Sequence, residues 1–250
     1  MNGWLSIVGL GPGGEGLLTP EVMHSLSNAT DVVGYVPYVA RIPQRDGLVK
    51  HASDNRVEIE RAQHALQMAS EGRKVAMVSS GDPGVFAMAS AVFEALEAGP
   101  VEWRELDIQV LPGITAMLAA SAKAGAPLGH DFCAINLSDN LKPWALVEKR
   151  IRLAIEGDFA MGFYNPRSKA RPEGFRKVLG LLSDICEPER LMIFARAVTT
   201  AEESLRIVEL KDAETEMADM RTVVLVGSSL TRRIDRNNGR PFVYTPRSVS

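Results

Sequence analysis

Three loops rich in glycine and proline are the parts of this sequence best suited to binding a ligand. Their sequences are GLGPGG at 9–14, SGDPGVF at 80–86 and PGITA at 112–116, and each is expected to follow a β-strand. None of them contains a lysine, which a phosphate-binding loop normally provides. Glycine backbone together with one acid, Asp82, instead suits an adenosine that carries a sulfonium and an amino acid tail. The loops therefore predict an adenosyl ligand rather than a nucleoside triphosphate.

Each loop also has a simpler interpretation. GLGPGG lacks the third glycine of a dinucleotide-binding loop, and the helix expected from Thr19 begins too far away to bind a pyrophosphate. The second expected strand, 31–35, ends without the acid that would bind a ribose, so a nicotinamide or flavin site is not favoured. Asp82 before Pro83 fits a helix N-cap, and Thr115 could bond to nearby backbone. The adenosyl prediction rests on the three loops together.

The elements that must position these loops follow an α/β pattern. Short apolar runs alternate with segments of helical period, which is typical of an α/β protein with mostly parallel sheets, whose ligands collect at the carboxyl ends of the strands. The segment 122–128 interrupts the pattern with Gly125 and Pro127, so we expect two α/β domains, 1–121 and 122–250. Strands are expected at 5–10, 31–35, 48–51, 74–79 and 107–111, then at 132–137, 159–164, 191–195, 204–210 and 222–226, with helices from Thr19 and over 62–69, 88–96, 144–155 and 173–185.

Composition excludes several other classes of protein. The 250 residues are 46% hydrophobic and carry a net charge of -3, which argues against a protein that binds nucleic acid backbone broadly. Cys133 and Cys186 do not form a CxxC pair, so neither a disulfide framework nor a metal site is indicated. No stretch approaches the roughly 18 uninterrupted apolar residues of a membrane span, and no signal peptide is recognisable. We expect a cytoplasmic protein that binds no metal, nucleic acid or membrane.

The loops, in this order, resemble the successive motifs of the tetrapyrrole methylase family over nearly the entire chain. The matching segments are VGLGPGG at 8–14, LLTPE at 17–21, SSGDPGVFAMA at 79–89, LPGITA at 111–116 and VGSSLT at 226–231. A second set resembles the branch of the family that methylates C17 of a corrin precursor and contracts its ring: GHDFCAINLSD at 129–139, FYNPRS at 163–168, ARAVTT at 195–200 and TRRIDRNNGRPFVYTPR at 231–247. The chain has two cysteines and no cysteine-rich addition. In this it resembles the family members that act on a metal-free substrate in the aerobic route to cobalamin more than those of the anaerobic route.

This resemblance implies two α/β domains with S-adenosylmethionine in the cleft between them, S-adenosylhomocysteine as a product, and a homodimer. The implied cofactor contacts are Pro12, Gly81, Asp82, Val85, Phe86, Thr115 and Ala116, followed by Asn165, Ala197 and Thr222. The sulfonium methyl group is already electrophilic, so the enzyme's main task would be to align it with the nucleophilic carbon and to exclude water.

The implied substrate carries many acetate and propionate groups, and arginine is the residue suited to carboxylates. The substrate-binding candidates are Arg41, Arg45, Tyr35, Arg167, Arg196 and Arg232, with Arg171, Arg233 and Tyr38 beside them. Each arginine could equally be a solvated surface charge. Ring contraction requires proton movement, for which His130 and Asp131 are the first choices, although His130 could be a structural hydrogen-bonder.

Other functions stay open at this point. The same fold could methylate a cobalt-containing precursor, ribosomal RNA or the modified histidine of an elongation factor, although the acidic net charge fits RNA poorly. A non-catalytic protein that binds an adenosyl ligand or a tetrapyrrole is a further alternative, and release of S-adenosylhomocysteine would distinguish an enzyme from it. Transient contact with neighbouring enzymes of the cobalamin pathway is also conceivable.

Overall fold

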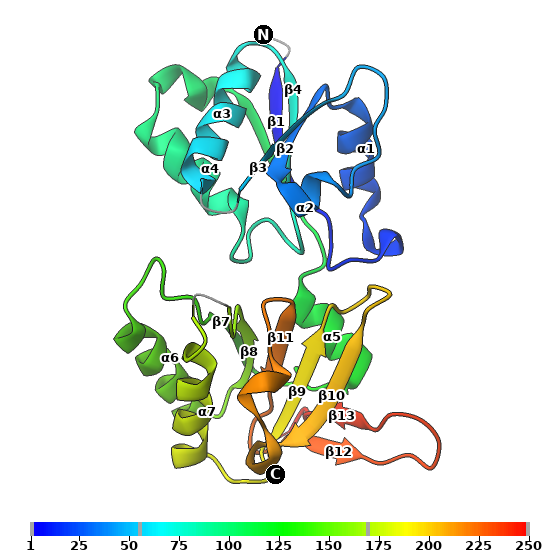
Figure 1. The fold of residues 1–250 in the computed structure, drawn as a ribbon, viewed down its shortest axis with the longest axis vertical. Coiled ribbons are helices and arrows are strands. Elements are labelled where there is room, and N and C mark those ends of the chain that lie inside the picture. The colour runs from blue at the N-terminus through cyan, green and yellow to red at the C-terminus, as the bar shows by residue number, and fades with distance from the viewer. Residues whose placement is uncertain (1–2, 55–56, 169–170, 249–250) are drawn as a thin grey trace. The chain divides into compact units, whose positions relative to one another are not determined.

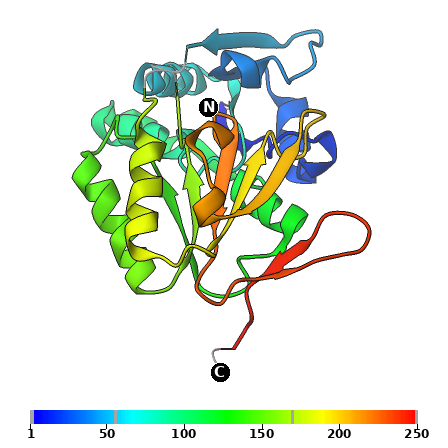
Figure 2. The ribbon, with the colours of Figure 1, turned by 60° about the horizontal axis from the view of Figure 1, so that its bottom comes forward.

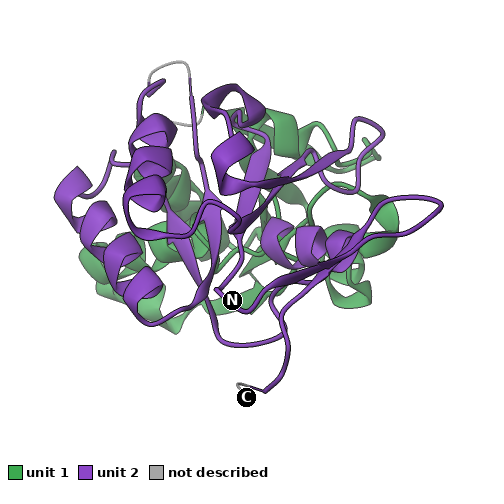
Figure 3. Cartoon of the chain, turned by 90° about the horizontal axis from the view of Figure 1, so that it is seen from below, with its two compact units in different colours: residues 1–115 green, residues 116–250 purple. Residues whose placement is uncertain are grey.

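The computed structural model describes residues 3–54, 57–168 and 171–248, and the chain divides into two compact units, residues 1–115 and 116–250 (Figure 3). The division falls at the start of helix α5 (Ala116–Ala124), whereas the sequence predicted it between 121 and 122. The helix belongs to the second unit because it packs on that unit's strand β11 (Thr222–Val226). Gly125, which was expected in the connection between domains, lies instead in a short strand of the second unit.

Unit 1 is built on a five-stranded, fully parallel sheet in the order β3-β2-β4-β1-β5 (Figure 1). All five strands predicted for this part of the chain are present. They are β1 (Trp4–Gly9), β2 (Asp31–Tyr35), β3 (Val49–Ser53), β4 (Lys74–Ser79) and β5 (Asp107–Leu111). The helices are α1 (Pro20–Asn28), α2 (Val36–Val39), α3 (Glu58–Ser70) and α4 (Met88–Ala98), with 3-10 turns at Glu15–Leu17 and Val101–Glu105.

Helices cover both faces of this sheet, so neighbouring residues of one strand enter different cores. Val8 and Val78 pack with Val22 of α1 on one face, whereas Ile7 and Met77 pack with α3 and α4 on the other. A strand buried on both faces is a continuous apolar run rather than an alternating one. This is why the sequence indicated these strands clearly.

Unit 2 contains a five-stranded mixed sheet in the order β10-β9-β11-β8-β7. Its strands are β7 (Phe132–Asn136), β8 (Ala160–Tyr164), β9 (Leu191–Arg196), β10 (Ser204–Glu209) and β11, and helices α6 (Trp144–Glu156) and α7 (Gly174–Ile185) share one core with it. Only β7 and β8 pair in parallel, while β11 is antiparallel to β8 and β9, and β10 to β9. This sheet differs from the mostly parallel arrangement expected, because the short turn 197–203 joins β9 to β10 and a parallel connection needs a crossover of about a dozen residues.

A small third sheet attaches the C-terminal hairpin to unit 2 (Figure 2). Strand β12 (Arg232–Ile234) pairs antiparallel with β13 (Phe242–Tyr244), which pairs in parallel with β6 (Gly125–Ala126). The sequence did not predict these strands, since two or three residues are too few to show a period. Within the residues that the structure describes, the helices are too short or too polar to cross a membrane.

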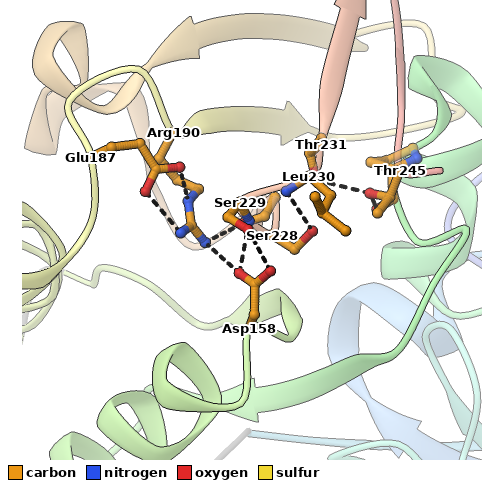
Figure 4. Close-up of polar contacts among 10 residues, drawn as sticks. Asp158, Glu187, Arg190, Ser228, Ser229, Leu230, Thr231 and Thr245 are labelled. Atoms are coloured by element: carbon orange, nitrogen blue, oxygen red, sulfur yellow. Dashed lines mark hydrogen bonds and ion pairs between the residues drawn. The ribbon is translucent and has the colours of Figure 1, made fainter. Parts of the chain in front are cut away.

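A polar network joins three turns of unit 2 at the edge where β9 begins (Figure 4). Arg190, only 5% exposed, donates to both carboxylate oxygens of Glu187 at 2.7 and 2.9 Å and to the carbonyl oxygen of Gly227 at 3.0 Å. Its Nη1 also lies 3.5 Å from Oδ1 of Asp158. Asp158 in turn accepts hydrogen bonds from the backbone N and the Oγ of Ser229, at 2.7 and 2.6 Å. The network therefore ties together the turns before β8, before β9 and after β11.

Glu187→Gln is expected to destabilise the protein at neutral pH and to lose this effect in acid. The hydrogen bonds from Arg190 lower the pKa of Glu187 below its usual range. A lowered pKa gives stabilisation that is present above the unfolded-state value of about 4.3 and is lost as the pH falls through the folded-state value. Because the carboxylate is 42% exposed, the loss near neutrality should be no more than about 1 kcal/mol.

Urea denaturation of Glu187→Gln and the parent chain, from neutral pH down to about pH 3, measures this difference. The matched control is Glu156→Gln, because Glu156 is exposed and has no side-chain partner among the described residues. A difference between Glu187→Gln and the parent chain that is independent of pH would contradict the assignment.

Candidate cofactor-binding site

The three glycine loops of unit 1 meet at the carboxyl edge of its sheet. β1 lies between β4 and β5, and all three strands run in the same direction. A Cβ placed on Gly9 would lie 2.6 Å from the carbonyl oxygen of Gly81 and 2.7 Å from the backbone N of Gly113. Gly11 and Gly81 also exchange backbone hydrogen bonds of 3.1 and 2.9 Å. The loops therefore touch through bare backbone, which only glycine permits at this spacing.

Asp82 connects two of these loops. Its Oδ1 accepts a hydrogen bond from the backbone N of Gly84 at 2.8 Å, and its Oδ2 accepts one from the backbone N of Gly113 at 3.1 Å. The helix-cap interpretation is wrong, because α4 begins only at Met88 and Ala87 is its N-cap. Asp82 instead closes its own turn and fixes the third loop beside it.

Phe86 adds an apolar side chain to this edge in an unusual conformation. Its φ is +53°, a left-handed region that bulky residues rarely adopt, and its side chain is 48% exposed. Of the other expected cofactor contacts in this part of the chain, Pro12 and Val85 are partly buried, Thr115 is buried, and Ala116 begins α5.

The corresponding edge of unit 2 holds the other three expected contacts. Asn165 follows β8 and Ala197 follows β9, while Thr222 begins β11, which runs the opposite way. All three therefore lie at the same edge of this sheet. Ala197 donates its backbone N to the carbonyl oxygen of Arg221 at 2.9 Å, and Thr222 Oγ1 donates to Asp219 at 2.8 Å.

Backbone strain concentrates on the expected contacts. Five described residues other than glycine have a positive φ, namely Phe86, Asp158, Asn165, Ala197 and Thr199. Three of them, Phe86, Asn165 and Ala197, are among the cofactor contacts that the sequence implied. Such conformations cost about 1–3 kcal/mol each and cluster at functional sites. The strain supports the predicted roles of these residues, which stay predictions.

Two of the expected substrate arginines are occupied by main-chain carbonyls. Arg41 donates to the carbonyl oxygens of Leu10 at 2.6 Å and Gly11 at 3.4 Å, and burial lowers its pKa. Arg45 donates to the carbonyl oxygens of Leu26 and Ala29. Arg41 therefore supports the main chain of the first glycine loop, and its guanidinium group is not free to bind a substrate carboxylate.

The remaining arginine candidates lie in unit 2, and most of them face acids. Arg196 Nε donates to Asp219 at 2.8 Å, Arg167 lies 3.8 Å from Glu216, and Arg233 donates to Asp235 at 2.7 Å. Arg196 and Asp219 line a small pocket with Phe194, Ser204, Arg206, Glu216, Met217 and Ala218. Arg232 is exposed and has no side-chain partner among the described residues. Its guanidinium group is therefore open to a substrate carboxylate.

Tyr35 ends β2 and therefore lies at the same edge of unit 1 as the glycine loops. Its ring meets that of Tyr38 edge to face, with the centroids 5.3 Å apart, and burial raises the pKa of Tyr38.

The structure does not bring His130 and Asp131 to the edge of unit 2 that holds the expected cofactor contacts. They precede β7, so they lie at its amino end, whereas Asn165 and Ala197 follow the parallel strands β8 and β9. Five strand residues separate these edges by about 16 Å. His130 Nδ1 lies 3.6 Å from Asp131 Oδ2, and the Asp131 side chain is 80% exposed. A substrate atom next to Asn165 would be out of hydrogen-bonding reach of His130, so the arrangement does not support the predicted catalytic role.

Sequence reasoning missed two polar residues at the carboxyl edge. Asn136 ends β7 and its Oδ1 accepts hydrogen bonds from Asn165 Nδ2 at 3.1 Å and the backbone N of Ser138 at 2.9 Å. Tyr164 ends β8, and its hydroxyl oxygen accepts a hydrogen bond from the backbone N of Met117 at 3.1 Å. Tyr164 is the last residue of the predicted strand 159–164 and Asn136 is the last but one of the predicted strand 132–137, and that position was the signal available. No group of three or more metal-ligating side chains occurs in the described part of the chain.

Comparison with known proteins identifies the family. A family model described as Tetrapyrrole (Corrin/Porphyrin) Methylases matches residues 5–214. A precorrin-3B C(17)-methyltransferase of Sinorhizobium sp is 48% identical over 99% of this chain and 97% of its own length. A probable cobalt-factor III C(17)-methyltransferase of Salmonella typhimurium is 36% identical over 96% of this chain and 99% of its own length. The crystal structure of the methyltransferase CobJ has 66% identity and a TM-score of 0.94, and covers 98% of this chain and 100% of that chain. The chain described here therefore belongs to the tetrapyrrole methylase family.

Proposed function

We propose that this chain transfers the methyl group of S-adenosylmethionine to C17 of precorrin-3B, with contraction of the macrocycle to precorrin-4. The observation that carries the proposal is the identity of 48% with a precorrin-3B C(17)-methyltransferase over nearly the full length of both chains. The lower identity of 36% with a cobalt-factor III enzyme favours the cobalt-free substrate.

The residues of unit 1 fit the proposed cofactor. Gly9 and Gly113 allow the three loops to approach one another closely, because a Cβ on either residue would overlap the backbone of another loop. The loops 9–14, 80–86 and 112–116 offer no lysine or arginine, which suits a ligand with a positive sulfonium and no phosphate. Asp82 fixes the spacing of two loops, and Phe86 offers an apolar ring beside them.

When bound, S-adenosylmethionine supplies an electrophilic methyl group, so the protein needs no covalent nucleophile. The work left to the chain is to hold donor and acceptor in line and to exclude water. Rigid loops serve that task, because an effective alignment depends on small displacements of the reacting atoms. The contacts between the glycine loops and the hydrogen bonds of Asp82 provide this rigidity at the edge of unit 1.

Incubation of the purified protein with precorrin-3B and methyl-labelled S-adenosylmethionine tests the function. Mass spectrometry should find one labelled methyl group in the product, and S-adenosylhomocysteine should be released in equal amount. Parallel reactions with the cobalt-containing precursor distinguish the two routes. Binding of S-adenosylhomocysteine without turnover of either precursor would mean that the chain is a binding protein.

Asp82→Ala is expected to weaken the binding of S-adenosylhomocysteine about tenfold, because a hydrogen bond to a charged group contributes roughly 1.5–3 kcal/mol and two of them hold these loops. Isothermal titration calorimetry measures the change. Asp46→Ala is the matched control, because Asp46 is exposed and has no side-chain partner among the residues that the structure covers. Equal affinity in both variants would exclude a role for Asp82 in shaping the site.

The proposal extends to the setting in which the enzyme works. We expect a cytoplasmic homodimer that makes transient contact with neighbouring enzymes of cobalamin synthesis. Light scattering after size-exclusion chromatography should give twice the 27.2 kDa mass of the chain. A monomeric mass with full activity would remove the dimer from the proposal.

A further inference from the structure

Two partly buried cations hold the turn that follows β7. Lys142 donates from Nζ to the carbonyl oxygen of Ser138 at 2.9 Å. Arg171 lies with Nη1 at 3.5 Å from the carbonyl oxygen of Leu137, the preceding residue, and its side chain is 17% exposed. The ammonium and guanidinium groups therefore contact consecutive carbonyls and lie at the carboxyl end of the same strand.

This turn belongs to the edge of unit 2 that carries the expected cofactor contacts. Asn136 Oδ1 accepts hydrogen bonds from the backbone N of Ser138, at 2.9 Å, and from Asn165 Nδ2, at 3.1 Å. Asn165 is one of the residues with a positive φ, at +52°. Because β7 and β8 are parallel neighbours, the two cations lie beside the strained end of β8.

The charge of the two cations is poorly balanced. Asp139 is the one acid that pairs with either of them among the described residues, and its carboxylate is 44% exposed and 3.9 Å from Arg171 Nε. Burial lowers the pKa of Lys142, the nearby Arg150 and Arg171 lower it further, and Asp139 opposes them. Desolvating like charges side by side costs free energy, so stability alone does not explain the arrangement.

Both cations keep donors for a ligand. An ammonium group has three donors and Lys142 uses one of them on Ser138, while the guanidinium group of Arg171 has five. A carboxylate is the anion that matches one ammonium and one guanidinium at a partly buried position. The proposed substrate carries acetate and propionate groups.

We propose that Lys142 and Arg171 form a subsite that binds one carboxylate of the tetrapyrrole substrate, an inference that rests on the proposed function. The subsite orients the macrocycle at the end of β7 and takes no part in the methyl transfer itself. The missing negative charge beside the two cations is then supplied by the substrate.

Lys142→Gln is expected to raise KM for precorrin-3B about tenfold with little change in kcat, as the loss of one hydrogen bond to a charged group predicts. A second readout does not need turnover: quenching of protein fluorescence by uroporphyrin, a tetrapyrrole that carries acetate and propionate groups. Its affinity should fall by a similar factor, and its dependence on salt should become weaker. Lys142→Arg should restore most of the affinity, because the charge returns.

Lys149→Gln is the matched control, since Lys149 is exposed on α6 and has no side-chain partner among the described residues. S-adenosylhomocysteine should bind equally to all of these variants. Uroporphyrin affinity and KM that are the same in Lys142→Gln and Lys149→Gln would overturn the proposal, as would a loss that Lys142→Arg does not repair or a parent chain without affinity for uroporphyrin.

The two proposals can fail separately. Methylation of precorrin-3B with an unchanged KM in Lys142→Gln would remove the subsite and leave the function. Uroporphyrin binding that depends on Lys142, without turnover of precorrin-3B, would support a carboxylate subsite and remove the proposed function.

Discussion

Gly113→Ala is expected to lower the free energy of unfolding by about 3 kcal/mol and to abolish the binding of S-adenosylhomocysteine, because overpacking costs 1–3 kcal/mol or more where the neighbours cannot move. The new Cβ would overlap the carbonyl oxygen of Gly81 and lie 2.8 Å from the carbonyl carbon and oxygen of Gly9. All of these atoms are backbone at the ends of packed strands, so no side chain can rotate away. The three loops would have to separate.

Gly16→Ala provides the matched control for this prediction. A Cβ at Gly16 would meet no atom within 4 Å, although this glycine lies just beyond the first loop. Its substitution should change stability by no more than about 0.5 kcal/mol. Urea denaturation followed by circular dichroism gives the stabilities, and calorimetry gives the affinities. If Gly113→Ala were as stable as Gly16→Ala and bound the ligand normally, the three loops could not meet through their backbones.

Most of the fold of unit 1 could be predicted from the sequence because its three central parallel strands, β1, β2 and β4, are buried on both faces. Segments such as 5–10 and 75–78 are almost entirely apolar, which few other elements of this length produce. Unit 2 was harder, since a pattern of apolar residues indicates a strand without giving its direction. The turn 197–203 is short enough to reverse the chain, and this makes β9 and β10 an antiparallel pair.

The candidate site was predictable to the extent that backbone geometry defines it. Glycines after adjacent parallel strands must meet, and Gly9, Gly81 and Gly113 do. The roles of charged side chains were not predictable in this way, because an arginine pattern does not show whether a carbonyl already occupies the guanidinium. Arg41 is the example. The chain order alone could have predicted that His130 lies at the amino end of β7, since a residue that precedes a strand lies at its amino end.

Arg190→Leu is expected to lower the free energy of unfolding by about 3 kcal/mol, although Arg190 lies outside the predicted cofactor and substrate contacts. The guanidinium is buried. It forms ion pairs with Glu187 and Asp158 and donates a hydrogen bond to the carbonyl oxygen of Gly227 (Figure 4). Removal of one partner of a buried ion pair typically costs about 3–5 kcal/mol, because the remaining charges lose their compensation. The partly exposed carboxylates of Glu187 and Asp158 place this case at the lower end of that range.

The same substitution at a surface ion pair distinguishes burial from charge as the cause. Arg152 donates to Glu148 at 3.1 and 2.8 Å, but its side chain is 51% exposed on α6, so Arg152→Leu should cost no more than about 0.5 kcal/mol. Arg190→Lys should fall between the two, since an ammonium group cannot reproduce the bidentate contact with Glu187. Below its melting temperature, Arg190→Leu should bind S-adenosylhomocysteine normally, because Arg190 precedes β9 and Ala197 follows it. Equal losses for Arg190→Leu and Arg152→Leu would mean that the network in Figure 4 does not stabilise unit 2.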